Sequence, residues 1–447
     1  MSGFMSASTK IRAAAALFAA VSMASLAYGQ ALPTATAAPS SGPGMPSIDG
    51  IFHYSLRGSE LLQTGYRGSG VNYSTVLSGD ASYSSPSVVR PFSMVYSGGL
   101  FLGSQYSSTV RTFQNFAVSQ GLVRGLWSFG ISDSVSYLPQ SPTTGLSGIP
   151  GVGDIGSSPA QGPSEGPSGG VLTYNSTNVS NALSGSVARR LTPLTSVSGG
   201  GSWSILRYPD GTGLENTQVA GQLAVTHQLD RRDTVSGSAT YSTFSYGAGI
   251  DLSIQTEGVN AAFSRVLSRT LSLSASAGPM WIGSSNSALV PSNLTVASNI
   301  SLSYAGEFTS AALTYSRGVN GGSGVQPGAL ADSVAFSAGR SYGRDWAASL
   351  TANYTHSGGL VKQTALVVGF PAGQFPFLYG GGNTNMAYGG AQVTRRISQS
   401  LSSYLSYNIQ HQSISNSLIF QNAFSGLSQT FGIGISFSPR STRLGQF

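Results

Sequence analysis

The chain of 447 residues has 22 Lys and Arg against 15 Asp and Glu, a formal net charge of +7, and only 8% of its residues are charged. Soluble domains carry about a quarter charged residues, so this composition disfavours an ordinary soluble protein. The sequence has no cysteine, which excludes disulfides, thiolate metal sites and a cysteine-linked lipid anchor. Its basic residues form no clustered stripe, so nucleic acid is not an expected partner.

The first residues have the features of a secretory signal. Lys10 and Arg12 precede an alanine-rich apolar run, and Ala-Tyr-Gly at 27–29 is a small-x-small cleavage site. We therefore expect a signal peptide over 1–29 that directs the chain across the inner membrane. An uncleaved membrane anchor is the alternative, but the apolar run is short. Without Lys10 and Arg12, 20 basic against 15 acidic residues leave a net charge of +5, which suits phosphate head groups or an anion-tolerant lumen.

Residues 30–48 are rich in Pro, Ala, Ser and Gly, and we expect a flexible periplasmic lead-in there. From residue 49 onward, apolar and small polar residues alternate. Over 271–278, Leu and Ala alternate with Ser and Gly, and over 431–437, Phe and Ile alternate with Gly and Ser. A period of two places the apolar residues on one face of a strand, as is typical of a strand between lipid and water. Tilted strands of about 9–11 residues suffice to cross a bilayer.

Short turns give these strands a hairpin rhythm of roughly 36–40 residues, with a longer last interval. The turn centres fall near Thr192, Asp230, Ser268, Phe308, Arg344 and Gln399. We therefore predict that residues 49–447 form an all-β fold, a transmembrane antiparallel up-and-down β-barrel with short periplasmic turns and longer extracellular loops. Closure of the barrel with both of its ends in the periplasm requires an even number of strands. The pattern gives 18 candidate strands, and 16 is the alternative because the alternation is weaker before residue 137.

The candidate strands cover most of the chain. They are 51–64, 71–83, 91–104, 109–120, 124–137, 174–190, 194–208, 216–229, 234–246, 251–266, 270–283, 293–306, 309–318, 332–342, 345–356, 385–397, 401–413 and 428–437. A secreted β-helix is the competing architecture, but its repeats run over about 20–30 residues with shorter strands, and no GGxGxD run occurs here.

Aromatic residues lie near the ends of the predicted strands, where amphipathic rings form girdles at the two membrane interfaces. The alternative is the general preference of aromatics for strands. The predicted girdle comprises Tyr208, Tyr241, Tyr246, Trp281, Tyr304, Tyr315, Tyr342, Trp346, Tyr354, Tyr388 and Phe437.

A catalytic function is not predicted. The histidines His53, His227, His356 and His411 lie far apart, and the sequence contains no H-E-x-x-H. Its G-x-S-x-G matches, at 162–166, 166–170 and 339–343, lie in a Pro- and Gly-rich link and at a predicted turn, so none forms a strand-to-helix nucleophile elbow. His356, before a predicted external loop, would be the first candidate in a hydrolytic barrel, and His227 and His411 suit interface positions. We expect no enzyme, no cofactor and no metal.

Arginine pairs mark several turns. Arg190 and Arg396 share the phase of the small polar residues, so they could project into the lumen near its periplasmic mouth, and Gln222 has the same lumen-facing phase. Arg189 and Arg395 share the apolar phase and should reach the inner-leaflet phosphates. A basic ring would bias a pore toward anions. The alternative is that most of these arginines are interface anchors or solvated turn residues.

Two long external loops are predicted, over 138–173 and 357–384. The first follows the fifth strand and is the third external loop, and here the chain resembles general bacterial porins, whose third loop folds inward. Signal peptide, alternating strands and terminal Phe447 extend this resemblance over most of the chain, although Phe437 ends the best last strand. The loop carries only Asp154 and Glu165, without the acidic cluster of porins, and it could instead be disordered outside.

The loop 357–384 is unusually apolar and could plug the lumen, contact a hydrophobic solute or extend a strand. The pore-lining candidates are Arg190, Arg396, Gln222, Asp154 and Glu165. The resemblance implies a porin-like outer-membrane channel for passive diffusion of small hydrophilic solutes. The alternative is a barrel for export or assembly, for example in exopolysaccharide secretion, with a plugged lumen. Expected partners are outer-membrane lipids and the barrel-assembly machinery, and a homo-oligomer is the alternative to a single copy of the chain.

Overall fold

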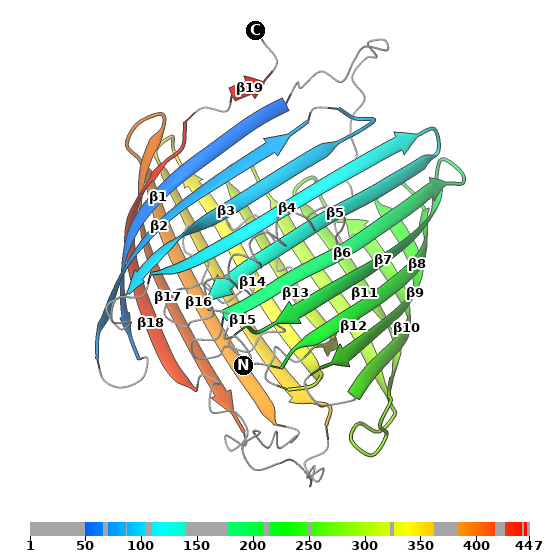
Figure 1. Ribbon diagram of the computed structural model, residues 1–447. Coiled ribbons are helices and arrows are strands. Elements are labelled where there is room, and N and C mark those ends of the chain that lie inside the picture. Colours follow the sequence, from blue (N-terminus) through cyan, green and yellow to red (C-terminus); the bar gives the residue numbers. More distant parts are fainter. Residues whose placement is uncertain are drawn as a thin grey trace, which may run out of the picture.

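The computed structural model describes residues 50–65, 70–85, 87–103, 110–139, 177–209, 214–247, 252–321, 326–361, 382–415, 425–439 and 442–444. These residues form one closed antiparallel barrel of 18 strands (Figure 1). The barrel closes where β1 pairs with β18, with Leu56 opposite Phe437 and Thr64 opposite Gln429. The predicted transmembrane antiparallel barrel is confirmed, and the count is 18 rather than 16.

Every predicted strand is present, with ends that differ by a few residues. The strands are β1 Gly50–Thr64, β2 Asn72–Ser84, β3 Phe92–Gly103, β4 Arg111–Arg124, β5 Trp127–Pro139, β6 Thr177–Arg190, β7 Thr195–Arg207, β8 Asn216–Gln228, β9 Asp233–Tyr246, β10 Leu252–Val266, β11 Leu271–Ser284, β12 Asn293–Ala305, β13 Thr309–Asn320, β14 Ala329–Tyr342, β15 Trp346–Gly359, β16 Asn383–Arg396, β17 Leu401–Ile414 and β18 Gly426–Phe437. A further short strand, β19 Thr442–Leu444, was not predicted, and it pairs with Gly50–Phe52 of β1.

The two ends of the barrel differ in their connections. Turns of a few residues join β4 to β5, β6 to β7 and the later pairs at one end, here called the turn end. Longer links lie at the other end, here called the loop end (Figure 1). The strands extend into both predicted long loops, because β5 reaches Pro139, β15 reaches Gly359 and β16 begins at Asn383. Strand pairing depends on backbone hydrogen bonds, so it continues beyond the apolar stretch that guided the prediction.

Several predictions fall outside the described residues. These include the signal peptide 1–29, the lead-in 30–48, most of loops 138–173 and 357–384, and Phe447. Among the described residues, no helix is long and apolar enough to cross a membrane.

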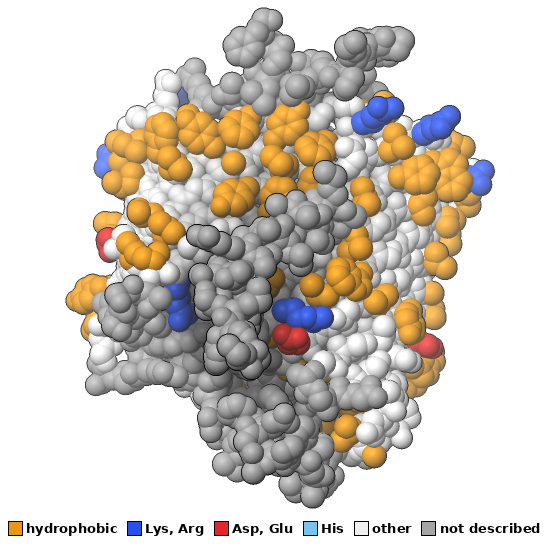
Figure 2. All heavy atoms as spheres, viewed as in Figure 1, with side chains coloured by type: hydrophobic (Ala, Val, Ile, Leu, Met, Phe, Trp, Pro, Cys, Tyr) orange, Lys and Arg blue, Asp and Glu red, His pale blue; other side chains and the backbone are white. Residues whose placement is uncertain are grey.

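Alternation along each strand separates two faces. Every second residue of β8 and β18, in register with Leu223 and Ile433, faces outward and most of these residues are apolar. The side chains of Leu223 and Ile433 are 67% and 63% exposed on the outer wall. The opposite phase of β18 carries Ser428 and Thr430, which point inward and are buried. Figure 2 shows apolar side chains spread over the outer wall, with few charges among them. An apolar outer band of this kind is the surface that a membrane-spanning barrel presents to lipid.

Candidate functional site: the lumen wall

Small hydroxyl side chains line the inner face of β5–β9. Cross-strand register places them on the phase opposite to the apolar outer residues, and each is half-buried. They include Ser128, Ser134, Ser196, Ser198, Ser236 and Ser238. Ser136 and Ser180, also inward, share a hydrogen bond of 2.5 Å between their hydroxyls. This part of the wall therefore offers donors and acceptors without fixed charge.

A second polar region lies on the inner face of β17, β18 and β1, and we call it the polar wall. It consists of Gln63, Ser406, Gln410, Gln412, Ser428 and Thr430, all 9% exposed or less. Gln63 Nε2 donates to Ser428 Oγ over 3.0 Å across the β1–β18 closure. Buried polar groups need such partners, because an unpaired one keeps its full desolvation cost.

An ion pair interrupts the neutral lining on β1 and β2. Register places Ser55 opposite Asp80 and Arg57 opposite Ser78, so all these side chains share the inner face. Arg57 Nη2 lies 3.0 Å from Asp80 Oδ2, and Ser55 Oγ donates to the same oxygen over 2.9 Å. The sequence reasoning missed this pair, because neither residue is unusual until the register of β1 with β2 is known.

Toward the loop end the inner face of β9–β11 becomes apolar. The apolar cluster consists of Leu214, Phe244, Tyr246, Leu252, Ile254, Ile282, Val290 and Val361. The link before β14 packs onto this cluster at Gly328. A Cβ at Gly328 would lie 2.6 Å from Ile254 Cδ1, and the φ of +68° also favours glycine at this position. Tyr246 Oη donates to the Gly321 carbonyl over 3.4 Å. The sequence carried a signal for this cluster, because the inward phase of β9 changes from Ser and Thr to Phe244 and Tyr246 near its end.

The predicted pore-lining arginines lie at the turn end. Arg190, the last residue of β6, is opposite Ser196, and Arg396, the last of β16, is opposite Ser402. Both positions have the inward phase, and both side chains are exposed. Gln222 lies opposite Gly200 and is also exposed. Asp154 and Glu165 lie outside the described residues.

Inward charges are few in the strands that the structure describes. In β1–β18, four arginines and one aspartate occupy inward positions, a difference of four minus one, or +3; they are Arg57, Arg111, Arg190, Arg396 and Asp80. Most of the wall is therefore neutral, with a small positive excess.

The outward arginines pair with aromatics at the turn end. The guanidinium of Arg189 lies 5.0 Å from the ring centre of Trp127, and that of Arg395 lies 5.3 Å from that of Trp346. The prediction that Tyr208, Tyr246 and Tyr388 belong to an aromatic girdle at the membrane interface was wrong, because these three rings are buried. Proximity to a strand end does not determine phase, and phase decides which face a ring joins.

The histidines sit in different surroundings. His356 Nδ1 lies 2.6 Å from Asn385 Oδ1, and Tyr354 donates to the same oxygen over 3.2 Å. His356 and Asn385 are directly opposite each other on the outward phase of β15 and β16. His227 Nδ1 lies 2.9 Å from Thr195 Oγ1 at the turn end. His356 therefore belongs to a hydrogen-bonded group on the outer wall, and it does not line the lumen.

No known protein-family model matches the chain, and no match was found among curated proteins. Solved structures from Pseudomonas aeruginosa are similar to it. OccK2 (OpdF) has 10% identity and a TM-score of 0.43, and the match covers 88% of this chain and 98% of that one. OpdK, solved with vanillate, has 9% identity and a TM-score of 0.42 over 89% and 100% of the two chains. OpdQ has 10% identity and a TM-score of 0.40 over 87% and 98%.

Proposed function

We propose that this chain is a porin-like channel of the bacterial outer membrane through which small hydrophilic solutes diffuse passively. The observation that carries the proposal is the half-exposed hydroxyl lining of β5–β9 inside a barrel of 18 strands. Barrels of 16–18 strands leave room for an aqueous lumen. Hydroxyl and amide groups offer hydrogen bonds to neutral solutes such as sugars, and the inward excess of arginine favours a mild preference for anions.

Single-channel conductance of the refolded protein in a planar bilayer, under a salt gradient, tests this proposal. Steady openings with a mild anion preference are the expected result. Arg190→Ala and Arg396→Ala together should reduce that preference while openings persist, because both side chains lie at one mouth of the barrel. Arg189→Ala with Arg395→Ala is the matched control, since these arginines face outward.

An export or assembly barrel with a plugged lumen is the alternative function. The apolar cluster at the loop end is the observation that favours it, because cluster residues face inward rather than toward lipid. A folded barrel that stays silent in the bilayer would support this alternative and overturn the channel. In either case, we propose the same partners as expected from the sequence: outer-membrane lipids, the assembly machinery and further copies of the chain.

A further inference from the structure

Three glycines lie directly opposite one another on the outer wall. Gly185 of β6 pairs with Gly201 of β7, and Gly201 pairs with Gly221 of β8. The row continues to Ile131 of β5 on one side and to Tyr241 of β9 on the other. Because neighbouring strands are about 4.8 Å apart, the three bare positions interrupt the apolar wall over roughly 14 Å.

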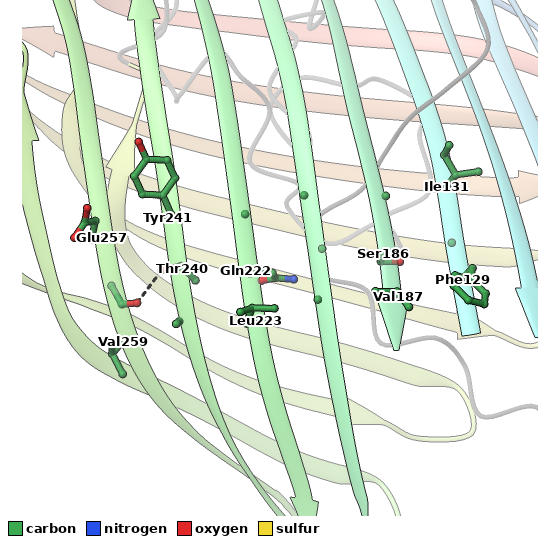
Figure 3. A pocket seen from close by; sticks show the side chains of 18 of the residues that line it. Phe129, Ile131, Ser186, Val187, Gln222, Leu223, Thr240, Tyr241, Glu257 and Val259 are labelled. Carbon is green, nitrogen blue, oxygen red and sulfur yellow. Dashed lines mark hydrogen bonds between the residues drawn. The ribbon is translucent and has the colours of Figure 1, made fainter. Parts of the chain in front are cut away.

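The bare row forms the floor of a groove of about 1030 Å³. Its walls are apolar and come from Phe129, Val187, Leu223 and Val259. Figure 3 shows Ile131 and Tyr241 on opposite sides of the groove, with Glu257 beyond Tyr241.

The barrel itself does not require glycine at these three positions. A Cβ at Gly185, Gly201 or Gly221 would meet its nearest atom at 3.9, 3.6 or 3.8 Å, which is ordinary van der Waals contact. None of the three has a positive φ. By contrast, a Cβ at Gly278 would lie 1.8 Å from the Val259 carbonyl oxygen. Glycine weakens a strand, so three glycines aligned in one row that opens a groove favour close approach by something outside the barrel.

One end of the groove is acidic. Glu257 of β10 lies directly between Tyr241 and Trp281 of its neighbouring strands, and all three face outward. Within the described part of the chain, the Glu257 carboxylate has no ion pair and no hydrogen bond. A second depression of about 360 Å³ adjoins it, and its lining combines polar Gln255, Ser292 and Asn293 with apolar Trp281, Ile282 and Leu294. The surface thus passes from an apolar groove to a carboxylate and then to amides.

We propose that the groove binds an acyl chain of a phospholipid whose headgroup bears an ammonium, and that the ammonium pairs with Glu257. The apolar groove takes the acyl chain, and the headgroup lies over the adjoining depression, where the Gln255 amide can donate to the phosphate while the terminal ammonium reaches Glu257. A cation beside Glu257 gains charge pairing and the faces of Tyr241 and Trp281. The outer wall of a second barrel is convex and would fill a groove one side chain deep poorly, whereas a flexible acyl chain can follow it.

Native mass spectrometry of the full chain in detergent tests this site with phosphatidylethanolamine and phosphatidylglycerol of identical acyl chains. We expect phosphatidylethanolamine to be retained at the lower lipid concentration. Glu257→Gln should weaken its retention roughly tenfold and leave phosphatidylglycerol unchanged. Gly201→Leu should reduce retention of both lipids, because the leucine fills the floor.

Gly237→Leu is the matched control. Gly237 lies outward on β9, opposite Val225 and Ala261, and a Cβ there meets nothing within 4 Å. This variant should retain both lipids as the parent chain does. Heat-modifiable migration would verify that each variant forms a barrel. Conductance does not enter this test, so failure of the lipid site and failure of the channel remain distinguishable.

Three results would overturn the proposal. Unchanged retention in a folded Gly201→Leu variant would show that the groove is not the site. Equal retention of the two lipids by the parent chain would remove the ammonium partner of Glu257. A dimer that Gly201→Leu dissociates would identify a second copy, rather than a lipid, as the occupant.

Discussion

Two regions of the inner face, the apolar cluster and the polar wall, are equally buried and chemically opposite. Ile254 in the cluster and Gln412 in the polar wall are both 0% exposed, and both have the inward phase of their strands. The cluster is covered by links between strands, with Val290 held in place because its N–H donates to the Asn286 carbonyl over 3.0 Å. Phase therefore determines which face a residue joins but not the chemistry of that face, because a buried inward position is apolar where links pack onto it and polar where it has hydrogen-bond partners, as Gln63 and Ser428 do.

The largest expected effect tests the apolar side of this comparison. Ile254→Ala should lower the free energy of unfolding by about 2–5 kcal/mol, because it opens a cavity in a region that is fully packed. The matched control is Ile433→Ala, whose side chain is 63% exposed on the outer wall and leaves no cavity behind. Urea unfolding in lipid vesicles, followed by tryptophan fluorescence, measures both variants. Equal losses would mean that the cluster is not a packed core.

The polar wall should be sensitive to a different change. Gln63→Ala removes the donor to Ser428 and leaves a buried hydroxyl without that partner, at a cost of about 1–3 kcal/mol. The double variant with Ser428→Ala should cost less than the sum of the two single variants, because the orphaned hydroxyl is gone. The same urea titration measures all three. Simple additivity would show that the bond between Gln63 and Ser428 contributes nothing.

We expect substitutions in the ion pair between Arg57 and Asp80 to change the ion preference of the channel clearly and its stability only a little. Asp80→Asn leaves Arg57 without its carboxylate and should raise anion selectivity in the bilayer experiment. Arg57→Gln should shift selectivity toward cations. Both side chains are partly exposed, so the pair itself stabilises the barrel little. If both variants moved the reversal potential in one direction, the pair would not face the conducting path.

The period of two predicted almost every strand and the face of its apolar residues, because both depend only on local sequence. Contacts across the barrel depend on register, which a single strand does not contain. Arg57 meets Asp80 only because Ser55 is opposite Asp80, and the glycine row exists only because Gly185, Gly201 and Gly221 align across three strands. Arg190 and Arg396 could be placed from phase alone, since strand parity fixes their direction.

The turn end offers the smallest test, because its connections are held by local hydrogen bonds rather than by a packed cluster. Asp230 Oδ1 accepts the backbone N–H groups of Arg232 and Asp233 over 2.6 and 2.8 Å. These two hydrogen bonds lower the pKa of Asp230 below its usual 3.8, and the bond from the Arg232 N–H has the larger effect. A carboxyl whose pKa is lower in the folded state stabilises the fold above its unfolded pKa and loses that contribution as the pH falls through its folded pKa.

Asp230→Ala should therefore lower the urea midpoint slightly at neutral pH, and the difference from the parent chain should narrow as the pH falls below 3.8. Asp230→Asn keeps one oxygen acceptor but no charge, so it should retain part of the turn's stability and show no such narrowing. The turn is fully solvated, and its contribution is local, whereas the cluster at the loop end joins several strands and links. A pH-independent difference between Asp230→Ala and the parent chain would mean that the carboxylate charge does not hold this turn.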